Sequence, residues 1–182
     1  MNISFIDGTP AEVPTEFDIY VHRLKRILES SHTVHHMMLR DMTISPCIGC
    51  FGCWVKTPGR CLSKDDTQHI CALYMASDVV VFASPVLYGF TSALLKTAQD
   101  KLIPLIHPYF ESVNGEVHHR RRYGQYPKLA LLLDRWEDID DEDVDIITRI
   151  YHRMALNLKS QLLFVGNTNQ SPEEVAHGIA AH

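Results

Sequence analysis

The sequence predicts an α/β fold in which helices cover a parallel five-stranded sheet, and three observations support this prediction. Five short apolar runs alternate along the 182 residues with segments whose apolar side chains recur at helical spacing. One run, Asp78–Pro85, is apolar almost throughout, as expected of a central parallel strand that is covered on both faces. We find no repeat, low-complexity tract or linker, so we expect a single domain over residues 1–182.

The first half of the chain is expected to supply three strands and two helices. Asn2–Asp7 is short, apolar and followed by Gly-Thr-Pro, which predicts the first strand. Glu16–Ser31 carries an apolar stripe at helical spacing, and Thr33–Arg40 is the candidate second strand. Asp65–Ser77 begins with acidic residues, which favour a helix N-terminus, and leads into the third strand at Asp78–Pro85.

The second half is expected to supply two further helices and two further strands. Thr91–Pro104 has the pattern of a helix. His107–Pro127 is too long and polar for a tight connection, so we interpret it as an excursion from the sheet. Lys128–Asp134 predicts the fourth strand, Asp141–Ser160 a helix with acidic residues at its N-terminus, and Gln161–Thr168 the last strand.

The alternation of strands and helices restricts the order of the strands. Right-handed crossover connections leave few arrangements, and 2-1-3-4-5 is a common one. In that order a ligand crevice lies beyond the carboxyl ends of the first and third strands. We therefore expect three loops to converge there, namely those that follow Asp7, Ser84 and Asp134.

Composition and charge limit the classes of partner. The apolar fraction of 46% allows a sizeable core, and 21% charged residues is ordinary for a globular protein. A net charge of −5 gives no electrostatic reason to expect nucleic acid or an anionic membrane as a partner. No run approaches the ~18 apolar residues of a membrane span, and the first residues lack the pattern of a signal peptide. We expect a cytoplasmic protein, in which thiols stay reduced.

Four of the five cysteines follow a C-x2-C-x2-C-x7-C pattern after the second strand. They are Cys47, Cys50, Cys53 and Cys61. Short spacings allow one loop to supply the thiolates of a 4Fe-4S cluster, and four thiolates also suit tetrahedral zinc. The apolar Phe51 and Trp54 favour a third interpretation, a loop that packs on the body with free or redox-paired thiols. We expect this third state in protein purified in air, because oxygen readily destroys an exposed cluster. The fifth cysteine, Cys71, has the surroundings of a core residue.

Two segments resemble a known family. "SPVLYGFTSALLKTAQDKL", residues 84–102, resembles the strand end and helix of the NAD(P)H-dependent FMN reductase and flavodoxin-like family. There a Ser/Thr-Pro-Val-Tyr-Tyr-Gly loop precedes a Leu-Lys pair and an Asp-Arg/Lys pair. The "CIGCFGCW...GRC...DD" run looks like the cysteine-bearing branch of that family, which includes the iron-sulfur flavoproteins. The resemblance extends over nearly the whole chain.

The resemblance implies a flavodoxin-like three-layer sandwich that binds FMN and uses NAD(P)H as co-substrate. A flavin ring is a flat plate that needs backbone amides at its polar edge and an apolar wall at its face. Pro85 would set the chain direction, and Gly89 would allow close approach of the backbone. The residues expected around the ring are Pro85, Val86, Leu87, Tyr88, Gly89 and Phe90, with Asp134 at the third loop.

The first loop departs from the family's phosphate-binding pattern. The positions that match are Gly8, Thr9, Pro10 and Thr15. The family's arginine position is Ala11, and Val13 and Pro14 occupy positions of Ser or Asn. Glu12 and Glu16 add negative charge near a dianionic phosphate, although Glu16 also suits a helix N-terminus. We therefore expect weak FMN binding, through the two threonines and backbone amides.

These observations predict an FMN-dependent NAD(P)H oxidoreductase that reduces a flavin, a quinone or another small acceptor. We assign no side chain as a catalytic acid or base, because the flavin carries the chemistry. The competing hypothesis is a flavodoxin-like protein that has lost FMN and serves in binding or assembly. We also expect a homodimer or higher homo-oligomer, because the aromatic excursion His107–Pro127 could cover a neighbour's flavin site.

Overall fold

The computed structural model describes residues 1–10, 15–135 and 139–181. The departures predicted at Ala11, Glu12, Val13 and Pro14 lie outside the described residues. Five parallel strands form the central sheet in the order β2-β1-β3-β7-β8, which confirms the predicted order 2-1-3-4-5. These strands are β1 (Asn2–Asp7), β2 (Thr33–Met38), β3 (Val79–Leu87), β7 (Lys128–Asp134) and β8 (Leu162–Asn167).

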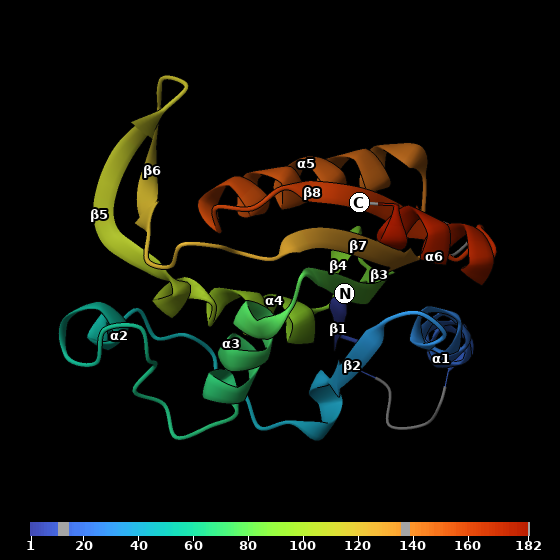
Figure 1. Ribbon diagram of the computed structural model, residues 1–182, viewed down its shortest axis with the longest axis horizontal. Coiled ribbons are helices and arrows are strands. Elements are labelled where there is room, and N and C mark those ends of the chain that lie inside the picture. Colours follow the sequence, from blue (N-terminus) through green and yellow to red (C-terminus); the bar gives the residue numbers. More distant parts are fainter. Residues whose placement is uncertain (11–14, 136–138, 182) are drawn as a thin grey trace.

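Helices lie on both sides of this sheet, as Figure 1 shows. The α-helices are α1 (Glu16–Glu29), α2 (Gly52–Val55), α3 (Thr67–Ala76), α4 (Ala93–Asp100), α5 (Asp141–Asn157) and α6 (Pro172–Ala180). Two short 3-10 turns are η1 (Leu39–Asp41) and η2 (Ile103–Leu105). None of the helices among the described residues is long and apolar enough to cross a membrane.

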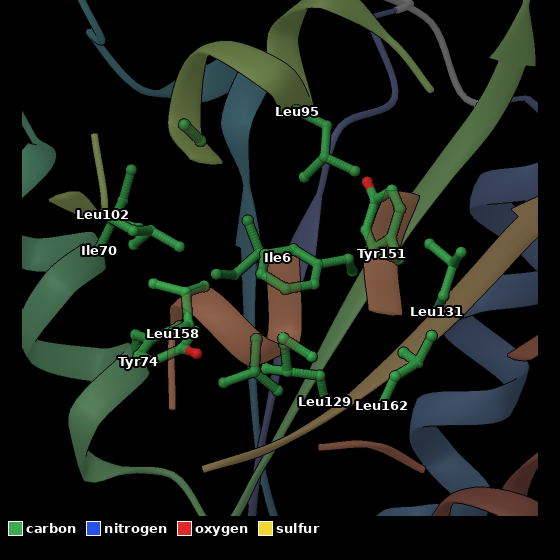
Figure 2. Packing of buried hydrophobic residues seen from close by; sticks show 14 of the residues in the cluster. Ile6, Ile70, Tyr74, Leu95, Leu102, Leu129, Leu131, Tyr151, Leu158 and Leu162 are labelled. Carbon is green, nitrogen blue, oxygen red and sulfur yellow. The ribbon is translucent and has the colours of Figure 1, made fainter. Parts of the chain in front are cut away.

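The core consists of two apolar clusters, one on each face of the sheet. Alternate residues of a strand point to opposite faces, so Ile6 packs with α3, α4 and α5, whereas Phe5 packs with α1 and α6. Figure 2 shows the first cluster, in which Tyr74 of α3 and Tyr151 of α5 lie around Ile6. The near-continuous apolar pattern of β3 is explained by this burial on both faces.

The elements absent from the sequence prediction include a hairpin and a C-terminal helix. The excursion contains an antiparallel hairpin of β5 (Ile106–Val113) and β6 (Glu116–Arg121), which curves away from the sheet beside α5 in Figure 1. Its turn is Asn114-Gly115, and both residues have positive φ, as a two-residue hairpin turn requires. Helix α6 follows the last strand and begins with a capping box between Ser171 and Glu174.

One helix is shorter than predicted. The segment Thr91–Pro104 is divided, because α4 ends at Asp100 and η2 starts at Ile103. A very short strand, β4 (Phe90–Thr91), precedes α4 and pairs antiparallel with the end of β3. The second strand likewise ends at Met38, after which η1 begins.

Ser92 joins α4 to the carboxyl end of β1. Its hydroxyl donates to the Gly8 carbonyl at 2.5 Å and accepts from the Leu95 N–H at 3.1 Å, so it also caps α4. The Ser92 N–H in turn donates to the Ser84 hydroxyl at 2.9 Å. The loops after β1 and β3 are therefore bonded to the same helix N-terminus.

We predict that Ser92→Ala lowers the free energy of unfolding by about 1–3 kcal/mol, because it removes a helix cap and a buried hydrogen bond. Urea unfolding measures the change. The control is Thr97→Ala on the exposed face of α4, which should change stability by less than ~0.5 kcal/mol. Equal stabilities of the two variants would contradict the assigned role of Ser92.

Candidate functional site

The candidate site lies at the carboxyl ends of β1, β3 and β7, where the three predicted loops meet. Pro85 at the end of β3 is in register with Asp134 of β7. The Gly8 N–H after β1 donates to the Ala83 carbonyl of β3 at 2.8 Å. Asp134 accepts a hydrogen bond of 2.9 Å from the Thr168 hydroxyl, which follows β8. The predicted convergence of the three loops is therefore present.

The first loop is held by a buried carboxylate. The Thr9 N–H and hydroxyl donate to the same Asp7 oxygen at 2.9 and 2.6 Å, and His36 Nε2 lies 2.9 Å from the other oxygen. Asp7 and Thr9 are 1% and 3% exposed, whereas Pro10 is exposed. A Cβ atom on Gly8 would come within 2.5 Å of Leu95 Cβ, so only glycine fits this approach to α4. The sequence analysis missed the role of Asp7.

Thr15 also bonds to a carboxylate. It caps α1 by accepting from the Asp18 N–H, while its own hydroxyl donates to an Asp18 oxygen at 2.7 Å. Arg40, which follows β2, lies 2.7 Å from the other Asp18 oxygen. Burial alone would raise the pKa of Asp18, but the Thr15 hydrogen bonds and Arg40 outweigh it and lower that pKa. The Arg40 guanidinium therefore lies near the N-terminus of α1.

The loop after β3 forms a tight turn with an exposed tip. Tyr88 and Gly89 both have positive φ, of 53° and 75°, which makes this the two-residue turn between β3 and β4. The Tyr88 side chain is fully exposed and Leu87 is about two-fifths exposed. The two residues before them, Pro85 and Val86, are buried, and Val86 packs in the core beneath the sheet end that carries the turn.

The described residues fit the ring of FMN better than its phosphate. Leu87, Tyr88 and the half-buried Phe90 offer an apolar surface beside backbone amides, as a flavin ring requires. On the phosphate side, the hydroxyls of Thr9 and Thr15 already donate to carboxylates. A hydroxyl has a single hydrogen to donate, so these two groups must be released before they can serve a phosphate.

The four clustered cysteines line one cavity of about 320 Å³ beside η2. They are Cys47, Cys50, Cys53 and Cys61. Cys47 and Cys50 are exposed, whereas Cys53 is buried. Burial and, next, the proximity of the other three cysteines raise the pKa of Cys53. All four cysteines therefore border the same cavity.

The four cysteines do not form a preformed site for a single metal ion within the described part of the chain. The described part of the chain contains no group of three or more His, Cys, Asp or Glu side chains that could hold a metal ion. Sulfurs around one zinc ion must each lie about 2.3 Å from it. A cubane cluster is larger than one ion, so its four ligands stand further apart. The four thiols that border the cavity are the donor set that a 4Fe-4S cluster uses.

The cysteine loop packs on the body through Trp54, as the sequence analysis proposed. The indole N–H lies 3.0 Å from the Ile106 carbonyl and 3.3 Å from that of Ile103. Its ring contacts His119 of the hairpin and stacks on Phe51. Phe51 itself is 57% exposed, so it covers the indole without being buried.

Cys61 lies beside a buried cation that the sequence analysis did not recognise. The Lys101 ammonium, at the C-terminal end of α4, is 3.5 Å from Cys61 Sγ. Burial opposes the thiolate, but hydrogen bonds from Ser63 and the charge of Lys101 lower the pKa of Cys61. Cys71, by contrast, is a core residue of α3 as predicted, and burial raises the pKa of its thiol to about 12.

Helix α4 separates the two parts of the candidate site. Its N-terminal residue Ala93 follows the Ser92 cap at the crevice, and its C-cap Lys101 contacts the cysteine loop. An eight-residue helix is about 12 Å long. The Ser92 cap and the Lys101 contact with Cys61 therefore lie at opposite ends of α4.

Comparison with curated proteins identifies relatives of the same kind. An iron-sulfur flavoprotein of Methanocaldococcus jannaschii is 31% identical over 105 residues, which cover 58% of this chain and 53% of that protein. An iron-sulfur flavoprotein of Archaeoglobus fulgidus is 31% identical over 100 residues, or 55% of this chain and 44% of that protein. The chain thus spans about half the length of the curated relatives it matches.

Solved structures share the fold. An FMN-dependent NADH-azoreductase from Bacillus anthracis, solved in complex with FMN, matches with a TM-score of 0.62. The match covers 98% of this chain and 93% of the azoreductase at 12% identity, which establishes similarity of fold. The model of the family "NADPH-dependent FMN reductase" matches residues 1–120, nearly two thirds of the sequence. On this evidence the chain belongs to the NADPH-dependent FMN reductase family.

Proposed function

We propose that the protein is an FMN-dependent oxidoreductase that takes electrons from NAD(P)H and delivers them to a small acceptor such as a flavin or a quinone. The observation that carries the proposal is the exposed β3–β4 turn, Leu87 to Phe90, at the meeting point of three loops. Ligands of parallel α/β sheets bind at this edge. The name of the family and the names of the relatives support the same cofactor.

In this proposal FMN supplies the redox chemistry, and the chain binds and orients it. The β3–β4 turn would hold the ring through its amides and the side chains of Leu87 and Tyr88. Asp134 would border the crevice at the end of β7, since it is paired in register with Pro85 of β3. No side chain needs to donate or remove a proton.

One observation favours the cofactor-free alternative. Thr9 and Thr15 bond to Asp7 and Asp18, so both hydroxyls have partners without a phosphate. A protein that had lost FMN and served in binding or assembly would need no phosphate-binding hydroxyls. The exposed Tyr88 favours the flavin, because a large apolar side chain at a crevice otherwise has no partner.

Flavin titration separates the two proposals. We expect saturable quenching of FMN fluorescence below ~100 µM FMN, and NADPH consumption that requires the added FMN. Tyr88→Ala should weaken binding, because it removes the exposed ring at the turn. Leu156→Ala, which truncates an exposed apolar side chain near the C-terminal end of α5, should leave binding unchanged. Absence of quenching at ~100 µM FMN would favour the cofactor-free alternative.

We further predict that Asp7→Asn tightens FMN binding by about tenfold or more. The change removes a buried negative charge near the expected phosphate and releases the Thr9 N–H and hydroxyl, while an amide oxygen can still accept from His36. Isothermal titration measures the affinity. Asp78→Asn, at the opposite end of β3, is the control and should have no effect. An unchanged or weaker affinity in Asp7→Asn would show that the phosphate binds elsewhere.

We also propose that the four cysteines hold a 4Fe-4S cluster, which the shared cavity and the names of the curated relatives support. We predict about four irons and four sulfides per chain after anaerobic purification, and loss of both in Cys50→Ser. In air we expect loss of iron without loss of fold, because Trp54 anchors the loop independently. Four freely reactive thiols and no iron under argon would contradict the cluster and support a packed loop with free thiols.

Self-association is the remaining part of the proposal. Exposed apolar side chains gather on the hairpin and α5: Tyr109, Phe110, Val117 and Ile150. Phe110, Val117 and Ile150 line a hollow of about 580 Å³ between these elements. The aromatic Tyr126, in contrast, packs on its own chain and donates to the Leu105 carbonyl. We predict a dimer by light scattering at ~50 µM, and a monomer for Val117→Glu. A monomeric parent protein at this concentration would rule out the dimer.

A further inference from the structure

A group of buried polar side chains beside the cysteine cavity has no part in the function proposed above. The Lys101 side chain is 2% exposed and that of Asp65 is 3% exposed. The ammonium lies 2.7 Å from the Ser63 hydroxyl, 3.3 Å from an Asp65 oxygen and 3.5 Å from Cys61 Sγ. A lysine ammonium has three hydrogens to donate, and these three acceptors account for them.

Asp65 holds both the lysine and the loop. One of its oxygens accepts from the Ser45 N–H at 3.0 Å, and the other accepts from the Thr67 N–H at 3.1 Å. Burial opposes the charge on Asp65, but these hydrogen bonds and Lys101 lower its pKa to about 2. The carboxylate therefore remains charged, and it pairs with the same ammonium that contacts Cys61.

The four cysteines consequently have unequal surroundings. Among the described residues that line the cavity, Lys101 is the one cation, and it contacts Cys61 alone of the four sulfurs. Cys47 and Cys50 are exposed to solvent, which screens charge. A buried ammonium that faces a single sulfur acts in a medium of low dielectric, where its effect is strongest.

We propose that Lys101 raises the reduction potential of the cluster by donating a hydrogen bond and a positive charge to the Cys61 sulfur. Reduction adds one electron to the cluster and its thiolates, and a nearby fixed cation stabilises that added negative charge. Hydrogen bonds to the sulfurs and the local charge are levers that set such potentials. Lys101 acts through Cys61 and is therefore a positioning residue. The inference rests on the cluster assigned under the proposed function.

Asp65, a partner of Lys101, provides a second test in which the reduction potential should change in the opposite direction. Asp65 offsets part of the lysine's charge at the cluster, while its Thr67 and Ser45 contacts are ones that an amide can partly keep. Loss of the lysine charge should lower the potential, and loss of the aspartate charge should raise it. Lys64 is the matched control, because it is an exposed lysine in the same loop.

The experiment is a redox titration under argon, followed by electron paramagnetic resonance, on full-length protein reconstituted with ferrous iron and sulfide. We expect Lys101→Met to shift the reduction equilibrium at least tenfold towards the oxidised cluster, which is about 59 mV for one electron. Asp65→Asn should shift it the other way, and Lys64→Gln should leave it unchanged. Lys101→Arg, which keeps the charge, should stay close to the parent protein.

Each outcome decides the inference. Equal potentials in the parent, Lys101→Met and Asp65→Asn proteins, at equal iron content, overturn it. If Lys101→Met fails to fold or to bind iron, Asp65→Asn alone decides: a raised potential supports the inference and an unchanged one overturns it. A parent protein that takes up no iron overturns the inference together with the cluster. A parent protein that holds the cluster but does not quench the fluorescence of added FMN disproves the flavin assignment and leaves the potentials interpretable.

Discussion

The candidate site depends on the hydrogen bonds of the Ser92 hydroxyl. This hydroxyl joins the backbone at the end of β1 to the first turn of α4, at a place where Gly8 alone allows the two to approach. Through Ser84 the same N-terminus is bonded to the end of β3. The shape of the crevice is therefore a consequence of hydrogen bonds between two serine hydroxyls and the backbone, and these hydrogen bonds hold the β3–β4 turn with its exposed side chains.

Local patterns were sufficient to predict most of this frame. The apolar run of β3 and the amphipathic stripe of α1 appear in the structure as predicted. Burial on both faces requires apolar residues throughout β3, and burial on one face requires them at helical spacing in α1. Two local signals were present and overlooked. Asn114-Gly115 is a strong hairpin signal, and Ser171-Pro172 with Glu174 is a strong helix start.

The contacts that give the site its character could not be predicted in this way. Lys101 meets a cysteine 40 positions earlier in the chain, and Arg40 meets Asp18 across the end of β2. Neither contact leaves a periodic pattern or a fixed spacing in the sequence, because only the folded chain brings these partners together. The same is true of Asp7, which reads as the polar end of a strand and acts as the acceptor for its own loop and for His36.

Helix α4 carries a constraint of its own, since its two ends serve different chemistry. Ser92 fixes one end at the crevice, and Lys101 fixes the other against Cys61. Each residue added to or removed from an α-helix turns everything beyond it by about 100° and shifts it by about 1.5 Å. A single-codon insertion or deletion in α4 would therefore swing the lysine away from the sulfur while leaving the sheet intact. The hairpin tip at Asn114 is under no such constraint, whereas the position of Lys101 depends on the number of residues in α4.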